Sequence, residues 1–363
     1  MAEAFNLEQY LTRGVEEIVK GVLKASLSNP RESAFLARYA LASRKSAEKR
    51  RSAEEAGEHI PPFLIASITN RCNLRCAGCY ARANGALCDR EADGPLSDAD
   101  WRKVFEEAAG MGVGFILLAG GEPLMRRDVL EAAGSIQNVL FPVFTNATLI
   151  DDAAVDLLSR CRNLIPIVSI EGDEAQTDAR RGGGVYRRLM QSVRLLKESG
   201  ILFGASVTVT KANIQTVTSS VFLGELRDQG FKVIVYVDYV PVEDESSDLA
   251  PEETERAYLA DRLIKLRTEP GDILFIAFPG DEMASGGCLA AGRGFFHINA
   301  HGGAEPCPFS PYSDVNVRET SLRQALHSPL FTHLRDGNLL TEDHSGGCVL
   351  FTHRDKVRLL LQR

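Results

Sequence analysis

The sequence predicts an α/β fold: a partial (β/α)6, TIM-like barrel with helices before it and a small module after it. Apolar, β-rich runs alternate with helical stretches between residues 63 and 240, a pattern typical of right-handed βαβ units and a parallel sheet. The length of 363 residues fits one such barrel with appendages. A stretch rich in Gly, Pro, His and Cys, residues 281–348, then breaks the alternation. We therefore expect three parts, at residues 1–60, 61–270 and 271–363.

Residues 1–60 are predicted to form two helices. Asn6 is a candidate N-cap for the first, and Asn29-Pro30 begins the second. The second ends in a charged run over residues 44–58, which we interpret as a solvated helix end or linker. An apolar stripe at helical spacing usually faces a core, so we expect these helices to cap the open barrel. Contact with a membrane surface is the alternative, and the acidic residues among the basic ones disfavour it. The stripe of the first helix consists of Leu7, Leu11, Val15, Ile18, Val19 and Val22.

Six strands are predicted next, separated by helical stretches such as 98–110, 151–160 and 184–199. Strands this apolar suit a sheet covered by helices, whose active site gathers at the carboxyl ends of the strands. The predicted strands are 63–69, 114–119, 139–144, 164–170, 202–209 and 232–240. The site is therefore expected just after Thr69, Ala119, Phe144, Ile170, Val209 and Val240.

The composition of the chain disfavours nucleic-acid-binding and membrane-spanning classes of protein. Apolar residues make up 44% and charged residues 25%, which is ordinary for a globular protein. The net charge of −8 gives no field that attracts nucleic acid. No apolar run reaches the roughly 18 residues that cross a bilayer, and the first residues lack a signal-peptide pattern, so we expect a cytoplasmic protein. In that reducing compartment, clustered cysteines are expected to be ligands or nucleophiles rather than disulfides.

Three of the eight cysteines follow the first strand at once, in TNRCNLRCAGCY. Thiolates this close in sequence, Cys72, Cys76 and Cys79, converge on a shared metal centre. On a [4Fe–4S] cluster they leave one iron open, and that iron can chelate the amino and carboxylate groups of a methionine moiety. Two alternatives remain: a zinc site that includes Cys88, or a ferredoxin-type cluster with a fourth cysteine. We expect Cys88 to be an incidental loop thiol.

The segments after the next strands strengthen the first interpretation. Gly120-Gly121-Glu122-Pro123 follows the second strand, about forty residues beyond the cysteines. Together with the cysteine loop it resembles the radical S-adenosylmethionine (SAM) superfamily, whose GGEP segment binds the SAM amino group. The glycines are expected to let backbone carbonyls approach the ligand, and Glu122 to accept from the ammonium.

The resemblance covers residues 63–240. FTNAT is similar to the family's TNGT, with Ala147 in place of a glycine, which disfavours a positive φ there. VSIEG and ARRGGG are similar to segments near the SAM ribose and carboxylate; for Arg180 or Arg181 the alternative is a surface helix start. VTVT and the tyrosine after the third cysteine are expected near the adenine. The expected SAM contacts are Tyr80, Gly120, Gly121, Glu122, Pro123, Asn146, Ser169, Glu171, Arg181 and Val207.

Cysteines in the last quarter resemble an accessory-cluster module. The order Cys288, thirteen residues, Gly302, four residues, Cys307 is similar to the first half of the SPASM module or its shorter form, Twitch. Only Cys348 follows, so the resemblance implies one auxiliary [4Fe–4S] cluster held by Cys288, Cys307 and Cys348. Its fourth position is either open to substrate or filled by another residue, with His344, His353 and Asp343 as candidates. The alternative is three ordinary buried thiols.

The resemblance implies an enzyme that cleaves SAM reductively to a 5′-deoxyadenosyl radical, with electrons from a low-potential donor of flavodoxin or ferredoxin type. The radical is expected to abstract hydrogen from a small molecule or lipid, with the auxiliary cluster as electron acceptor or substrate anchor. Asp238, beside Tyr236 and Tyr239 at the end of the sixth strand, is the candidate catalytic base. The alternative is that these three side chains only fill the barrel edge.

Two other functions compete with this one. A peptide or protein maturase, of sulfatase-maturase or ribosomal-peptide type, is weakened because residues 1–60 look helical only. A non-catalytic iron–sulfur redox or sensor protein would not need the SAM-binding segments.

Overall fold

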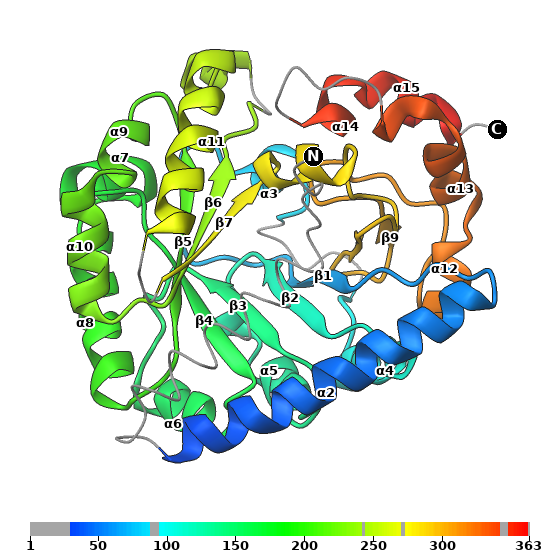
Figure 1. Ribbon diagram of the computed structural model, residues 1–363, viewed down its shortest axis with the longest axis horizontal. Coiled ribbons are helices and arrows are strands. Elements are labelled where there is room, and N and C mark those ends of the chain that lie inside the picture. Colours follow the sequence, from blue (N-terminus) through cyan, green and yellow to red (C-terminus); the bar gives the residue numbers. More distant parts are fainter. Residues whose placement is uncertain (1–29, 88–93, 242–243, 270–272, 342–347, 362–363) are drawn as a thin grey trace.

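The protein is built around one mostly parallel sheet of nine strands (Figure 1). The structure is a computed structural model and describes residues 30–87, 94–241, 244–269, 273–341 and 348–361. The strand order across the sheet is β7-β6-β5-β4-β3-β2-β1-β8-β9. The strands are β1 Phe63–Thr69, β2 Phe115–Gly120, β3 Phe141–Thr145, β4 Leu164–Ser169, β5 Gly204–Val209, β6 Val233–Asp238, β7 Leu274–Phe278, β8 Phe295–Ile298 and β9 Ala304–Glu305.

All six predicted strands are present, with ends within two residues of the predicted ones. They are parallel and lie in sequence order, which confirms the predicted α/β class. The sheet is wider than predicted, because β7 pairs parallel with β6, β8 pairs parallel with β1, and β9 turns back antiparallel. Both edges therefore receive chain from beyond residue 270, and the predicted boundary there does not coincide with the end of the sheet.

Helices connect the strands in the order that the alternation predicts. The predicted helices 98–110, 151–160 and 184–199 appear as α4, α6 and α8. Local signals set their starts: Ser97 and Asp100 form a capping box on α4. The described helices are α2 Pro30–Glu55, α3 Tyr80–Ala83, α4 Asp98–Met111, α5 Arg127–Gly134, α6 Asp152–Arg160, α7 Glu174–Arg181, α8 Val185–Glu198, α9 Ile214–Val217, α10 Ser220–Gln229, α11 Glu253–Thr268, α12 Leu322–Leu326, α13 Pro329–Asp336, α14 Val349–Thr352 and α15 Arg354–Leu360.

Helix α2 closes the amino-terminal end of the barrel. Its Phe35 and Tyr39 are buried in a small cluster with Leu140, Ile165 and Val235, and the Tyr39 hydroxyl donates to the Gly114 carbonyl at 3.3 Å. The helix runs past α4 and α5 along one side of the molecule (Figure 1). This confirms the predicted capping role for the second helix; the first predicted helix and Asn29 lie outside the described residues.

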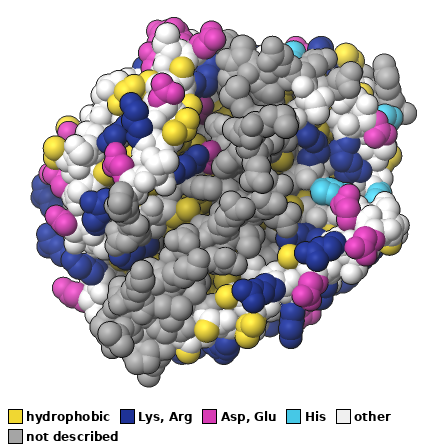
Figure 2. Space-filling view, in the orientation of Figure 1, with side chains coloured by type: hydrophobic (Ala, Val, Ile, Leu, Met, Phe, Trp, Pro, Cys, Tyr) yellow, Lys and Arg dark blue, Asp and Glu magenta, His cyan; other side chains and the backbone are white. Residues whose placement is uncertain are grey.

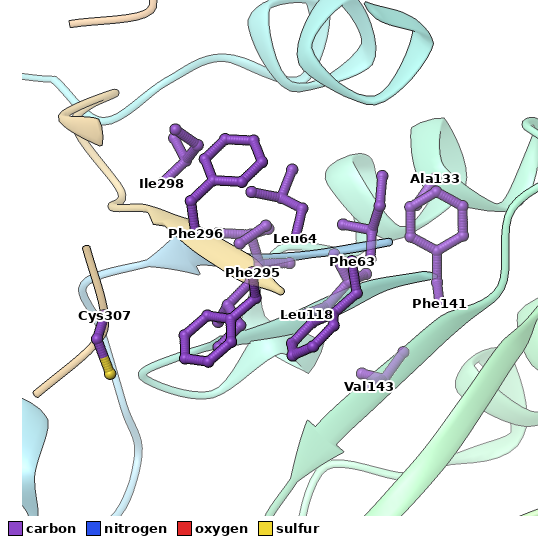
Figure 3. Packing of buried hydrophobic residues seen from close by; sticks show 14 of the residues in the cluster. Phe63, Leu64, Leu118, Ala133, Phe141, Val143, Phe295, Phe296, Ile298 and Cys307 are labelled. Carbon is purple, nitrogen blue, oxygen red and sulfur yellow. The ribbon is translucent and has the colours of Figure 1, made fainter. Parts of the chain in front are cut away.

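Alternate residues of β1 and β8 build two apolar layers (Figure 3). Phe63 and Phe295 stack with ring centroids 4.9 Å apart on one face, whereas Leu64 and Phe296 point to the other. Because Phe63 pairs with Phe295 in the sheet, the C-terminal part is joined to the first barrel strand by backbone hydrogen bonds as well as by packing.

The molecular surface carries charges of both signs, interspersed over the described part of the face in Figure 2. Of the helices that the structure describes, none combines the length and the apolar character needed to cross a membrane.

Candidate functional site

Most of the residues that the sequence analysis predicts as site residues line one cavity. It has a volume of about 300 Å³ and opens at the carboxyl ends of the barrel strands. Its walls include three cysteines from the loop after β1 and three from the C-terminal part: Cys72, Cys76, Cys79, Cys288, Cys307 and Cys348. Two cysteine triads far apart in sequence therefore face one space.

The loop with the first triad is fixed by contacts to three other segments. The Ala77 amide donates to the Arg180 carbonyl at 2.8 Å, which ties the loop to α7. The Asn73 side chain donates to the Thr148 hydroxyl at 2.9 Å. At Gly78, with φ 61°, a Cβ would lie 2.1 Å from the Tyr239 hydroxyl, so only glycine fits under that ring. The three sulfurs are thus held without a disulfide, since all three cysteines are free.

Burial keeps the thiols of Cys72 and Cys76 protonated in the absence of a metal. It raises the pKa of Cys72 to about 11 and also raises that of Cys76, where Arg181 and Arg180 act in the opposite direction. Thiolates therefore form here only as a metal binds and displaces the protons.

The spacing of the donors distinguishes between kinds of metal centre. Among the described residues, no three His, Cys, Asp or Glu side chains converge closely enough for a single metal ion. Four thiolates on one zinc lie roughly 4 Å from one another. An iron–sulfur cube spreads its ligands more widely, because each binds a different corner. The arrangement of Cys72, Cys76 and Cys79 around one cavity suits such a cube; Cys88 lies outside the described residues.

The glycine pair Gly120-Gly121, at the end of β2, packs closely against the loop that carries the first cysteines. A Cβ on Gly121 would lie 1.9 Å from the Arg71 carbonyl oxygen, and one on Gly120 would lie 2.3 Å from that of Thr69. The amides of Gly121 and Glu122 donate to the same two carbonyls at 2.9 and 2.8 Å. Both glycines line the cavity, but their lack of a side chain serves the close approach of the cysteine loop.

Glu122 lines the cavity and is also bound within the protein. It is 1% exposed and accepts from the Leu124 amide at 3.1 Å, the Thr145 hydroxyl at 2.7 Å and the Asn146 amide at 2.8 Å. Burial raises its pKa despite these donors. Glu122 therefore joins the ends of β2 and β3 at the cavity wall. The next residue, Pro123, is buried off that wall and begins the 3₁₀ helix Pro123–Met125.

Glu171 pairs with both arginines of the Arg-Gly stretch. Its carboxylate, 2% exposed, accepts from Arg180 Nη1 at 2.5 Å, from Arg181 Nε at 2.8 Å and from the Thr208 amide at 3.1 Å. Burial acts to raise the pKa of Glu171, but Arg181 and Arg180 outweigh it and the pKa is lowered. Both arginines line the cavity and Glu171 lies behind them, so it is placed to hold the guanidinium groups rather than to meet a ligand.

The remaining predicted contacts divide into two groups. Tyr80, Asn146 and Ser169 line the cavity. Val207 does not: it is fully buried, and the alternation of β5 turns Ser206 and Thr208 to the cavity instead.

Ala147 takes a positive φ of 61°, contrary to the expectation from its side chain. It is fully buried, and its carbonyl accepts from the Ser192 hydroxyl at 2.7 Å, which helps hold the loop after β3 in this conformation.

Asp238 is the acidic side chain at the end of β6 that faces the cavity. It is 6% exposed, and burial raises its pKa to about 6, with Arg256 acting in the opposite direction. Tyr239 lines the same wall, and its buried hydroxyl has no hydrogen-bond partner among the described residues. Tyr236 is turned into the core, where its hydroxyl donates to the Val217 carbonyl at 2.7 Å.

The second triad contains an acidic residue that sequence reasoning missed. Glu282 lines the cavity beside Cys288, Cys307 and Cys348. Burial raises its pKa to about 8, although the Cys288 thiol and the Leu289 amide hydrogen-bond to it. The available signal was an acidic residue six positions before Cys288. Of the predicted candidates, His344 and Asp343 lie outside the described residues, and His353 precedes α15 away from the cavity wall.

Comparison with known proteins agrees with the geometry. Residues 66–220 match the model of the Radical SAM superfamily. The chain is 29% identical to the AdoMet-dependent heme synthase of Methanosarcina barkeri, over 81% of this chain and 89% of the relative. It is 29% identical to the PqqA peptide cyclase of Gluconobacter oxydans, over 49% of this chain and 50% of the relative. Streptococcus suis SuiB bound to precursor peptide SuiA shares the fold, with a TM-score of 0.63 and 18% identity over 80% of this chain and 70% of SuiB.

Proposed function

We propose that this chain is a radical SAM enzyme whose SAM-binding [4Fe–4S] cluster is held by Cys72, Cys76 and Cys79. The match of residues 66–220 to the superfamily's model and the similarity to the heme synthase support this proposal. We further propose that Cys288, Cys307 and Cys348 hold an auxiliary [4Fe–4S] cluster. The observation that carries both assignments is that the two triads line one cavity. The thiols fit the role, because they are free and belong to segments held in place by other contacts.

When bound, the reduced cluster and SAM supply a 5′-deoxyadenosyl radical that abstracts hydrogen from a substrate. The protein's own residues bind and orient. Arg180 and Arg181, fixed by Glu171, present positive charge to the SAM carboxylate beside Cys76. Asn146, Ser169 and the tyrosine after the third cysteine complete a polar side of the cavity for the rest of the nucleoside.

The proposed substrate is a small molecule or lipid with substantial apolar surface. Much of the cavity wall is aromatic or aliphatic, and such a wall excludes water from a reactive species. The phenylalanines in that wall are Phe63, Phe144, Phe278, Phe295 and Phe309. The similarity to a heme synthase over most of both chains also favours a small molecule.

Asp238 is proposed to take the proton that an oxidised substrate releases. A base works best when its pKa lies near the working pH, and burial places that of Asp238 at about 6. Its place at the end of β6 puts it on the cavity wall beside Tyr239.

The electron is proposed to come from a low-potential donor of flavodoxin or ferredoxin type, in the cytoplasm, where the thiols stay reduced. Cys288, Cys307 and Cys348 would hold an auxiliary cluster, which would supply an electron acceptor or an anchor for the substrate.

A peptide substrate is the second candidate. The fold shared with SuiB, a protein bound to a precursor peptide in its crystal, favours it, as does the similarity to a peptide cyclase. Both resemblances are weaker than that to the heme synthase in identity or in coverage.

The first test is anaerobic incubation with SAM and dithionite, followed by measurement of 5′-deoxyadenosine. We expect product from the wild type and a loss to background for Cys72→Ala, Cys76→Ala or Cys79→Ala. Cys161→Ala is the matched control, because this free and partly exposed cysteine follows α6, away from the cavity wall. Undiminished product from any variant of the triad would overturn the assignment.

A further inference from the structure

A buried carboxylate lies among the three C-terminal cysteines. Glu282 belongs to the 3₁₀ helix Gly280–Ser285, which follows β7, and its side chain is 3% exposed. It lines the cavity with Cys288, Cys307 and Cys348, which come from three other stretches of chain. The thiol of Cys288 and the amide of Leu289 both hydrogen-bond to it.

Burial raises the pKa of all three thiols, and Glu282 acts in the same direction on each. A buried carboxylate is costly unless it is paired with a cation or binds a metal. Among the described side chains, none forms an ion pair with Glu282. Arg293 is the cation whose charge reaches it, but that guanidinium donates to the carbonyls of Cys288 and Gly286, at 2.5 and 3.1 Å.

Asp281, the residue before Glu282 in the same helix, is a buried carboxylate with both a cation and a hydrogen-bond donor. Asp281, also buried, forms an ion pair with Arg267 at 2.8 Å and accepts from the Ala277 amide at 2.8 Å. It lies off the cavity wall. The two adjacent acidic residues thus differ in their partners. Asp281 is paired with Arg267, whereas Glu282 lines the cavity with three thiols.

We propose that Glu282 is the fourth protein ligand of the auxiliary cluster, with a carboxylate oxygen on the iron that Cys288, Cys307 and Cys348 leave without a thiolate. This rests on the proposed function, since it requires an auxiliary cluster at that triad. Such a cluster has no open iron for substrate. Its role is therefore that of an electron acceptor rather than a substrate anchor, because a fully coordinated cluster exchanges electrons without binding anything.

The test uses the full chain with Cys72, Cys76 and Cys79 all replaced by alanine, so that only the auxiliary cluster remains. The protein is labelled with [5-¹³C]glutamate, and the reduced cluster is examined by electron–nuclear double resonance. We expect a ¹³C coupling that is absent from the same protein with Glu282→Gln. We also expect Glu282→Gln to change the EPR spectrum of the cluster and to make it sensitive to added imidazole, to which the parent is indifferent. Asp281→Asn is the matched control and should lower stability while leaving the spectrum unchanged.

A parent cluster with no ¹³C coupling, or one that binds imidazole as readily as Glu282→Gln does, would overturn the inference while leaving the auxiliary cluster intact. A parent with no iron at all would overturn the auxiliary cluster and this inference together, so the two failures are distinguishable. If Glu282→Gln does not fold, the presence or absence of the ¹³C coupling in the parent decides the question.

Discussion

At the scale of single residues, the candidate site depends on carboxylates in contrasting surroundings. Glu171 is held charged by two arginines, whereas Asp238 is buried without a hydrogen bond from a described residue, and its pKa is raised to about 6. Pairs of titratable groups whose pKa values are pushed apart are typical of functional sites. The contrast leads to opposite predictions for the two residues.

Asp238→Asn is expected to stabilise the protein at neutral pH. The folded-state pKa of about 6 exceeds the unfolded value of 3.8. The Asp238 carboxyl group therefore contributes most to stability below pH 3.8, where it is protonated in both states. That contribution is lost as the pH rises through 6. Two pKa units correspond to about 3 kcal/mol in the free energy of unfolding. Urea unfolding at pH 8 should show a gain of up to that size in the variant, and the gain should shrink as pH falls towards 4.

The same variant should cleave SAM without substrate at close to the wild-type rate, because Asp238 is assigned to the substrate. A loss of stability at pH 8 would contradict the assigned burial of its charge. A loss of SAM cleavage in a folded variant would contradict its assignment to the substrate.

Glu171→Gln is expected to destabilise the protein by about 3 kcal/mol, because it leaves two largely buried guanidinium groups without a counter-charge. Since the pKa of Glu171 is lowered from 4.5, its contribution is present above pH 4.5 and is lost as pH falls through the folded-state value. Urea unfolding of both proteins should therefore show a gap at pH 7 that narrows below pH 4.5. An equal gap at both pH values would indicate a packing effect instead of an ion pair.

At the scale of elements, the loops after β1, β2 and β3 form one interlocked unit. Glu122 joins the ends of β2 and β3, and the backbone after β1 passes directly against the glycine pair. Each loop is therefore positioned by its neighbours. The loop of the first cysteine triad contacts Thr148, 75 residues beyond Asn73, and packs directly against Gly121.

Gly121→Ala tests that unit. The added Cβ would lie 1.9 Å from the Arg71 carbonyl oxygen, and the three nearest atoms are all backbone atoms of Arg71, which cannot move aside as the end of a flexible side chain could. We expect iron content and SAM cleavage to fall at least tenfold. Gly110→Ala is the control: it lies in α4 with open space around it, so it should leave both unchanged and stabilise the helix by about 1 kcal/mol. Normal iron content in Gly121→Ala would show that the loop tolerates displacement.

The sequence predicted the elements well and the contacts between them poorly. Strand runs are local signals, and all six predicted strands appear in the structure. The closely spaced Cys72, Cys76 and Cys79 line one cavity. The occupied carboxylate of Glu122 and the position of Glu282 depend on contacts across the fold, which one sequence does not encode locally. The motif that predicted Val207 as a contact does not reveal which face of β5 borders the cavity. The neighbouring residues Ser206 and Thr208 line it instead.

At the scale of the whole molecule, the sheet itself fixes the relation between the two cysteine triads. Strand β1 leads into the first triad and pairs with β8, which lies between Cys288 and Cys307 in the chain. Both triads are therefore anchored to neighbouring strands and share one cavity. This arrangement suits an enzyme in which a substrate lies between a site of radical generation and a site of electron removal.

If each triad holds its own [4Fe–4S] cluster, iron and sulfide analysis after anaerobic reconstitution should count both clusters. The wild type should contain about eight irons and eight sulfides per chain, four for each cluster. Replacing either triad by alanines should leave about four, and only the protein with Cys72, Cys76 and Cys79 intact should still yield 5′-deoxyadenosine. A wild type with about four irons that are all lost with the first triad would rule out the auxiliary cluster, and zinc in place of iron would rule out both clusters.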